Sequence, residues 1–260
     1  MTGRPDAPTP GLTVVSLVTD DVLHAMSRGT LDAQLRPGEV EWVTVRANER
    51  GWNAATALNA GIARAQAPWV VCAHQDVLFP RGWWERTHAQ LAAWRGPLGV
   101  AGLVGVTEAG EFRGHVLDPH GHRRWGPLPA PVASLDEHVL VLPAAGPRFD
   151  PATPGFHCYG TDIARRARAD GLDAIAIDAP VVHLSGGRLD NGFAVASRWL
   201  LDKWGAQSGG VIATPAALLS DPGRASSHRR LGARWRRRRS RRRSACRCTA
   251  IGGGESDAAR

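Results

Sequence analysis

The chain has almost no lysine and little cysteine. Lys203 is the only lysine among 260 residues, and the four cysteines, at positions 72, 158, 246 and 248, include no CxxC pair. Neither a disulfide framework nor a thiolate zinc site is indicated, so a reducing cytoplasm is the expected location. No apolar run approaches the roughly 18 residues of a membrane-spanning helix, and no apolar stretch near the N-terminus is typical of a signal peptide.

The net positive charge of the chain is confined to one end. Residues 224–260 hold 13 arginines against Glu255 and Asp257, which gives this segment a net charge of +11. Because the whole chain carries +8, residues 1–223 carry a net charge of −3. Such a low-complexity tail cannot bury apolar area and is predicted to be disordered. It is either a solvated terminus or a weak contact for an anionic surface, RNA or lipid headgroups at the inner membrane face.

The first half alternates between two hydrophobic periods. Apolar runs over residues 12–18, 40–45 and 69–73 predict buried strands, and helical patterns cover 22–35 and 53–66. This β-α-β-α-β order predicts an α/β fold of Rossmann type, with a mostly parallel central sheet flanked by helices.

The second half is less regular. Its expected elements are helices over 83–94, 161–170 and 191–204, and strands over 98–106, 132–142 and 173–177. We expect a single domain over residues 11–210, with residues 1–10 disordered and 211–260 forming a linker and the Arg-rich tail.

Polar residues follow the strand over 69–73 directly. The strand stops at His74, Gln75 and Asp76. In open α/β sheets, ligands bind at the carboxyl ends of the strands. Asp76 is therefore expected to bind a ligand or a metal; the alternative is that it only caps a turn.

Three further polar segments lie at element ends. They are residues 16–20, the loop and helix start NERGWNAATALN at 48–59, and FHCYGTD at 156–162. The second segment can approach a phosphate or ribose, although neither GxGxxG nor a P-loop is present. Asp162 opens a predicted helix, where a carboxylate is favoured by the helix dipole, so a simple capping role is the alternative to a catalytic one.

Histidines are the remaining candidates for metal ligands. His183 leaves a strand into a Gly-Gly turn, and the sheet should bring it to the same edge as Asp76 and Asp162. A carboxylate and an imidazole suit Mn²⁺, with Mg²⁺ as the alternative. His115, His120 and His122 lie close together in the sequence, either as a second metal site or as part of a solvated hairpin.

Taken together, these segments resemble family 2 glycosyltransferases of the GT-A fold. The resemblance covers roughly residues 12–204 and depends on the order of NERGWNAATALNAGIARAQAPWVVCAHQDVLFPRGW, LDEHVLVL, FDPATPGFHCYGTDIARRARADGL and DAPVVHLSGG. It is most similar to the streptomycin-biosynthesis type of glycosyltransferase-like protein, in which HQD stands in place of DxD.

The resemblance implies a role for each segment. Asp76 would hold the divalent cation on the diphosphate of a nucleotide-sugar donor, His183 would complete the metal site, and Asp162 would be the general base of an inverting transfer to a hydroxyl acceptor. The residues expected at the donor are Ser16, Thr19, Asn48, Asn59, His74, Gln75, Asp136 and Glu137.

Three functions stay open on the sequence alone. A glycosyltransferase is favoured, a GT-A-like protein that binds nucleotide or glycan without turnover is the second, and a protein whose Arg-rich tail does the binding is the third. If Asp162 only caps its helix, the base would be Asp136, Glu137 or His157. Trp83 and Trp84 either stack on an acceptor sugar or pack in the core.

Overall fold

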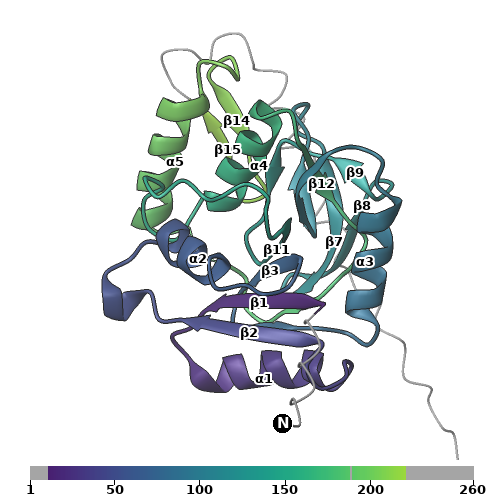
Figure 1. Cartoon of the computed structure of the whole chain (residues 1–260). Coiled ribbons are helices and arrows are strands. Elements are labelled where there is room, and N and C mark those ends of the chain that lie inside the picture. The colour runs from purple at the N-terminus through teal and green to yellow at the C-terminus, as the bar shows by residue number, and fades with distance from the viewer. Residues whose placement is uncertain (1–10, 188, 221–260) are drawn as a thin grey trace, which may run out of the picture.

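A seven-stranded sheet, ordered β2-β1-β3-β11-β5-β12-β9, forms the centre of the fold (Figure 1). The structure is a computed structural model that describes residues 11–187 and 189–220. Strands β11 and β9 run against the other five, so the predicted mostly parallel sheet is confirmed. The strands are β1 (Leu12–Leu17), β2 (Val40–Val45), β3 (Trp69–Ala73), β5 (Leu98–Gly102), β9 (Ala130–Pro131), β11 (Val139–Pro143) and β12 (Asp173–Ala176).

Helices cover both faces of this sheet because its strands are apolar on both sides. Val15 and Val70 share a buried cluster with residues of α2 and α4. The alternate residues, Val14 and Val71, pack with residues of α1 and α3 in a second cluster. The helices are α1 (Asp21–Asp32), α2 (Ala54–Ile62), α3 (Trp83–Ala93), α4 (Tyr159–Ala169) and α5 (Asn191–Trp204), and a 3₁₀ turn covers Asn48–Arg50.

Polar side chains fix the starts of three helices. Asp20 accepts hydrogen bonds from the first-turn amides of α1, Asn53 does so for α2, and Asp190 for α5. Each satisfies amides that have no partner within the helix. All five predicted helices begin within two residues of where the sequence placed them, and the largest difference is at α4, which starts at Tyr159 rather than at Thr161.

A second sheet, ordered β10-β6-β7-β13-β4 with β8 paired to β7, lies beside the first. Two predicted strands are divided to form it: 98–106 breaks at Leu103, and 132–142 breaks at Asp136–His138. The segment expected as a solvated hairpin or loop near 111–124 is a regular β7–β8 hairpin. The strands are β4 (Val77–Leu78), β6 (Val104–Val106), β7 (Phe112–Asp118), β8 (Gly121–Trp125), β10 (Ser134–Leu135) and β13 (Val182–His183).

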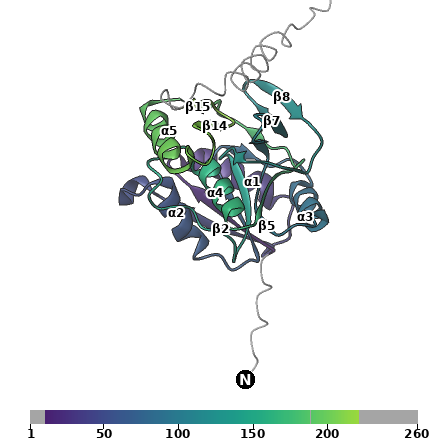
Figure 2. The same ribbon diagram turned by 90° about the horizontal axis from the view of Figure 1, so that it is seen from above.

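Residues 211–220, expected as a linker, instead form a hairpin of β14 (Val211–Ala213) and β15 (Leu218–Ser220). Ile212 and Leu219 pack against Leu200 and Trp204 of α5, which explains why this segment is ordered. Figure 2 shows the β14–β15 hairpin on the same side of the molecule as the β7–β8 hairpin. The predicted disorder at residues 1–10 and in the Arg-rich segment lies outside the described residues. Within the described part of the chain, no helix has the length and apolar character needed to cross a membrane.

Candidate active site

The end of β3 and the beginning of β11 meet at one edge of the large sheet. Strand β11 runs antiparallel to β3 with Val139 opposite Ala73, and the His74 amide donates to the His138 carbonyl oxygen at 2.9 Å. The residues that follow β3 and those that precede β11 therefore lie side by side. This pairing explains why two polar segments about 60 residues apart share one site.

Strand pairing also brings His183 to Asp76. In the β13–β4 pair, His183 lies opposite Val77, and the Leu184 amide donates to the Asp76 carbonyl oxygen at 3.0 Å. The Nε2 atom of His183 is 3.5 Å from Asp76 Oδ1 and 3.4 Å from His74 Nδ1. The predicted proximity of Asp76 and His183 is thus present, and His74 joins them.

His74, Asp76 and His183 form a set that fits a divalent cation, here called the His-Asp-His cluster. One ligand atom from each residue lies within 4.8 Å of the others. Burial and the neighbouring His183 lower the pKa of His74 to about 4, so its imidazole is neutral and can ligate. Although burial opposes the shift, the hydrogen bond and charge of His183 lower the pKa of Asp76, which stays ionised. Two imidazoles and one carboxylate suit Mn²⁺ better than Mg²⁺.

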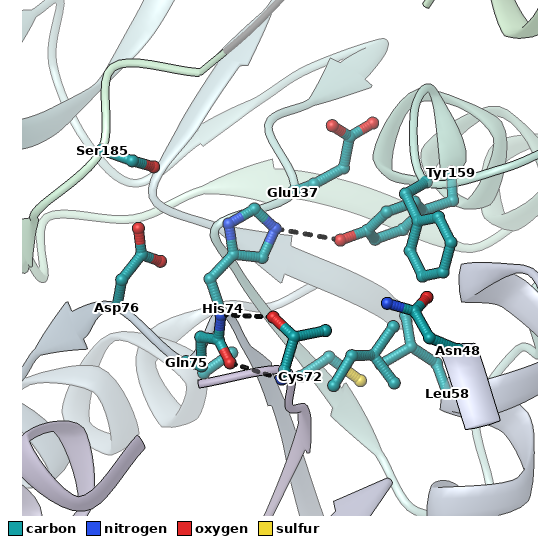
Figure 3. A pocket seen from close by; sticks show the side chains of 13 residues that line it. Asn48, Leu58, Cys72, His74, Gln75, Asp76, Glu137, Tyr159 and Ser185 are labelled. Atoms are coloured by element: carbon teal, nitrogen blue, oxygen red, sulfur yellow. Dashed lines mark hydrogen bonds between the residues drawn. The ribbon is translucent and has the colours of Figure 1, made fainter. Parts of the chain in front are cut away.

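A cavity of about 370 Å³, the strand-edge pocket, opens beside this cluster (Figure 3). Tyr159 forms part of its wall, and its hydroxyl lies 3.1 Å from His74 Nε2. The lining residues are Leu17, Thr19, Asn48, Leu58, Cys72, Ala73, His74, Gln75, Asp76, Glu137, Phe156, Tyr159 and Ser185.

Six of the eight residues expected at the donor lie at this edge, five of them in the pocket wall. Gln75 also holds the β1–α1 loop, because its Oε1 accepts from the amides of Thr19 at 2.7 Å and Asp20 at 2.9 Å. Thr19 and Asn48 are exposed and line the pocket, and their donor contacts stay a prediction.

Ser16 and Asn59 do not reach the pocket, which corrects their expected donor contacts. Ser16 is fully buried because its side chain points from β1 into the protein interior. The Asn59 amide donates to the Phe149 carbonyl oxygen at 2.8 Å and accepts from the Phe149 amide at 3.0 Å. Its side chain therefore anchors the segment before α4 rather than binding a ligand.

His138 is the site residue that the sequence reasoning missed. It is 2% exposed, its ring stacks on that of His183 at 5.3 Å, and its Nδ1 lies 2.6 Å from Asp136 Oδ1. Although burial opposes the shift, His138 lowers the pKa of Asp136, so the carboxylate is ionised. The available signal was the Asp-Glu-His run that interrupts an otherwise apolar strand.

Glu137 has a different environment from its neighbour. The Gly160 amide donates to its Oε1 at 3.4 Å, and burial together with the Asp136 charge raises the pKa of Glu137 to about 8. Adjacent carboxylates with separated pKa values are typical of sites that move protons.

Asp162 lies behind the site rather than in the strand-edge pocket. It is 1% exposed, and its Oδ1 accepts from Trp204 Nε1 at 2.7 Å and from Lys203 Nζ at 2.7 Å. Its amide donates to the Cys158 carbonyl oxygen at 3.0 Å, so it stands inside the first turn of α4 and does not cap the helix. The predicted convergence of Asp162 with Asp76 and His183 is therefore not seen in the pocket lining.

A second cavity, also of about 370 Å³, adjoins the first and is called the hairpin pocket. The β7–β8 hairpin, the loop after His183, the start of α5 and the β14–β15 turn enclose it. Four residues line both cavities: His74, Glu137, Phe156 and Ser185. Glu137 is thus the carboxylate at the junction of the two.

The three neighbouring histidines do not gather into a metal site. His115 and His122 contact each other through their Nε2 atoms, and His115 Nδ1 lies 2.5 Å from Asp178 Oδ1. His120 lies elsewhere, with Nε2 3.3 Å from the Gly186 carbonyl oxygen. Trp83 is fully buried and donates from Nε1 to the Ala179 carbonyl oxygen at 3.0 Å, so core packing is its role.

Comparison with known proteins finds a family match over part of the chain. Residues 35–143, less than half of the chain, match glycosyl transferase family 2, and this match runs from the segment before β2 to the end of β11. The predicted resemblance to family 2 glycosyltransferases, with a GT-A-like α/β fold, is confirmed. No curated protein sequence matches the chain.

Three solved structures are similar to the chain at low identity. The mannosyltransferase PcManGT from Pyrobaculum calidifontis, in complex with GDP-Man and Mn²⁺, has a TM-score of 0.49 and 16% identity over 76% of this chain and 64% of that one. S. aureus TarS residues 1–349 have a TM-score of 0.47 and 10% identity, over 77% of this chain and 68% of that one. GalNAc-T7 with UDP, GalNAc and Mn²⁺ has a TM-score of 0.46 and 11% identity, over 89% of this chain and 55% of that one. The chain spans less than two thirds of the first structure's length.

Proposed function

We propose that the protein is a nucleotide-sugar-dependent glycosyltransferase that binds its donor in the strand-edge pocket. The family match supports glycosyl transfer as the chemistry. The observation that carries the proposal is the His-Asp-His cluster beside a cavity at the carboxyl edge of β3. Ligands of α/β sheets bind at that edge.

The His-Asp-His cluster is the proposed site of the divalent cation, Mn²⁺ or Mg²⁺. The Asp76 carboxylate and the neutral His74 imidazole are in the states that ligation needs. Although burial opposes the shift, the hydrogen bond and charge of Asp76 raise the pKa of His183, so cation binding there would displace a proton. When bound, the cation supplies positive charge that stabilises the departing nucleoside diphosphate. His138 and Tyr159 hold the rings of His183 and His74 from the outer side.

The proton of the acceptor hydroxyl needs a base at the junction of the two cavities. We propose Glu137 for this role, because it lines both pockets and its raised pKa lies near neutral pH. The acceptor oxygen would attack the anomeric carbon as the bond to the diphosphate oxygen breaks, with its proton passing to Glu137. Such a single displacement inverts the configuration.

The resemblance assigns the base to Asp162 instead, and that assignment stays a prediction. The burial of Asp162, its ion pair with Lys203 and its absence from both pocket linings favour a structural role. Comparing the turnover of Glu137→Gln and Asp162→Asn separates the two assignments.

A non-catalytic nucleotide- or glycan-binding protein is the second candidate function. It is favoured by HQD in place of DxD at residues 74–76. The two candidates differ in one measurable outcome, which is the acceptor-dependent release of nucleoside diphosphate from a nucleotide sugar.

Calorimetry with UDP and GDP, in Mn²⁺ and again in EDTA, tests the proposal. Binding should need the cation and should be lost in His183→Ala. His88→Ala, an exposed histidine on α3, is the matched control and should bind normally. Equal affinity for the nucleotides in EDTA would contradict the proposed metal-dependent donor site.

A further inference from the structure

Two of the three hairpin histidines share one face of the β7–β8 hairpin. His115 lies opposite Arg124 and His122 lies opposite Leu117, so the two histidines are diagonal neighbours across the paired strands. The other face of the hairpin lines the hairpin pocket through Phe112, Val116, Asp118, His120, Arg123 and Trp125. His115 and His122, here called the hairpin histidine pair, therefore point away from that pocket.

The rings of the hairpin histidine pair meet edge to edge, with their Nε2 atoms between them. The two nitrogen atoms are 2.5 Å apart, whereas the ring centroids are 4.8 Å apart and the ring planes differ by 30°. This separation is below the roughly 2.7 Å at which hydrogen bonds from N–H donors begin. The two Nε2 atoms are thus directed at a single point on the surface of the hairpin.

Asp178 fixes which nitrogen of His115 carries a proton. Its Oδ1 lies 2.5 Å from His115 Nδ1, and its Oδ2 accepts from Arg124 Nη2 at 2.8 Å. Gln90 of α3 holds the Asp178 backbone, since its Oε1 accepts from the amide at 2.7 Å and its Nε2 donates to the carbonyl oxygen at 2.8 Å. With Nδ1–H donated to the carboxylate, His115 Nε2 presents a lone pair. A carboxylate placed behind a histidine in this way is typical of metal ligands.

The chemistry of the pair suits a late first-row divalent cation. Imidazole nitrogen is a good ligand for Zn²⁺, Cu²⁺ and Ni²⁺, whereas Mg²⁺ and Ca²⁺ prefer oxygen. Zn–N distances of about 2.0–2.1 Å in a tetrahedral arrangement would place the two Nε2 atoms about 3.3 Å apart. His122 is exposed on β8, so its ring is free to turn outward by the roughly 1 Å that this requires.

The number of ligands and the neighbouring charge narrow the choice further. In the part of the chain that the structure describes, only the His-Asp-His cluster brings three candidate ligand atoms together. The hairpin histidine pair supplies two, which leaves two positions of a tetrahedral cation for water. An anion is disfavoured, because His115 Nε2 presents a lone pair and Arg124 is already paired with Asp178.

We propose that the hairpin histidine pair is a second cation site, separate from the His-Asp-His cluster, and that it binds Zn²⁺ through the Nε2 atoms of His115 and His122. The bound cation joins β7 to β8, and Asp178 connects it to the segment after β12. It thus fixes the hairpin whose other face lines the hairpin pocket. No step of the proposed transfer uses this cation, so the inference goes beyond the proposed function.

Calorimetric titration of the full chain with Zn²⁺ tests the site. All samples carry His183→Ala, so that the His-Asp-His cluster does not contribute to the count of bound ions. This chain should bind one more equivalent of Zn²⁺ than the chains that also carry His115→Ala or His122→Ala. Asp178→Asn should weaken the binding of that equivalent by about 10–100-fold, because His115 loses its carboxylate partner. Mg²⁺ should not compete with it.

His120→Ala is the matched control. His120 is exposed in the turn of the same hairpin, but its Nε2 lies 3.3 Å from the Gly186 carbonyl oxygen, away from the pair. This variant should bind the full number of Zn²⁺ ions. Long-range ¹H–¹⁵N NMR spectra should show that Zn²⁺ shifts the Nε2 signals of His115 and His122 and leaves that of His120 in place. Melting temperatures without metal report whether each variant is folded.

The possible results decide the inference independently of nucleotide binding. The site is overturned if His122→Ala binds as many Zn²⁺ ions with the same affinity, or if His120→Ala loses the same equivalent. Equal affinity of the pair for Mg²⁺ would overturn the assignment to imidazole nitrogen atoms. A chain that binds Zn²⁺ through the pair but binds no nucleotide would retain this inference and lose the proposed function.

Discussion

The His74 amide donates a hydrogen bond to the His138 carbonyl oxygen at 2.9 Å. This bond continues the β3–β11 ladder by one step beyond the paired strands and holds the two polar segments in register. On one side of it stands the His-Asp-His cluster, and on the other stand Asp136 and Glu137. A change in this backbone contact would move proposed metal ligands and proposed base together.

Replacing His138 by alanine should weaken cation binding without removing a ligand. The ring of His138 stacks on His183 and pairs with Asp136, so its loss frees the orientation of one proposed ligand. Outer contacts of this kind change metal affinity by about 10–100-fold. Mn²⁺ titration by calorimetry checks the affinity, with His88→Ala as the control. Unchanged Mn²⁺ affinity in a folded variant would show that His183 needs no support from His138.

Glu137→Gln should make the protein more stable at alkaline pH and less active. Burial and the Asp136 charge raise the pKa of Glu137 from its ordinary value of 4.5 to about 8, so the folded state binds this proton more tightly than the unfolded chain. The free energy of unfolding of the wild type should therefore fall as pH rises from about 4.5 to about 8, and the melting temperature of the variant should fall less over the same range.

The activity of the wild type should have the opposite pH dependence. Only the ionised carboxylate accepts a proton, so turnover should rise with pH on the acidic side of about 8. Glu137→Gln should reduce turnover by a factor on the order of 10² or more and remove this dependence. Full turnover in Glu137→Gln would exclude it as the base.

Asp162→Asn should lower stability more than turnover. The change leaves Lys203 with Asp150 as its remaining carboxylate partner and weakens the bond to the Trp204 indole, which predicts a loss of about 1–3 kcal/mol. Turnover of the folded variant should stay within about tenfold of wild type, whereas loss of a general base costs about 10²–10⁴-fold.

Asp150→Asn is the control for that variant. Asp150 shares Lys203 but makes no contact with the Trp204 indole in the structure's described part. The two variants should differ in thermal melting and agree in turnover. A turnover loss of 10² or more confined to Asp162→Asn would restore Asp162 as the base.

Two glycine-to-alanine changes in helices should have opposite effects. A methyl group at Gly61 in α2 would overlap the Val15 side chain of β1, so Gly61→Ala should cost about 1–3 kcal/mol. Nothing lies within 4 Å of the same position at Gly29 in α1, where alanine should stabilise by up to about 1 kcal/mol. Urea unfolding of both variants checks the signs, and equal destabilisation would contradict this packing of α2 on the sheet.

The spacing of apolar residues predicted most of the fold, because the first half of the chain alternates regular strands and helices. The strand over 40–45 has the same bounds in the structure, and the helix starts agree where Asp20, Asn53 and Asp190 cap them. Strand breaks were not predictable in the same way. Leu103 and the residues 136–138 sit within apolar runs, and the sheets to which the two halves belong depend on distant partners.

The site was predictable where it follows a strand end and not where tertiary packing decides. Asp76 and His183 meet because β4 and β13 pair, as their positions at strand ends indicated. Ser16 and Asn59 also lie near element ends. However, the Ser16 side chain is on the buried side of β1, and the Asn59 side chain is held by hydrogen bonds to the Phe149 backbone. The burial of Asp162 depends on Trp204, which is 42 residues away and carried no signal of that contact.

Lys203 is held between Asp150 at 2.6 Å and Asp162 at 2.7 Å, and it joins α5 to α4 and to the segment before it. Because no other lysine exists in the chain, an amine-directed label can react within the chain at this side chain alone, apart from the N-terminal amine. Both carboxylates hold the ammonium group while α5 is docked, so a label must compete with two ion pairs. The rate of labelling thus becomes a single-site measure of how often α5 lifts from the body of the protein, and a bound ligand that clamps α5 should slow it.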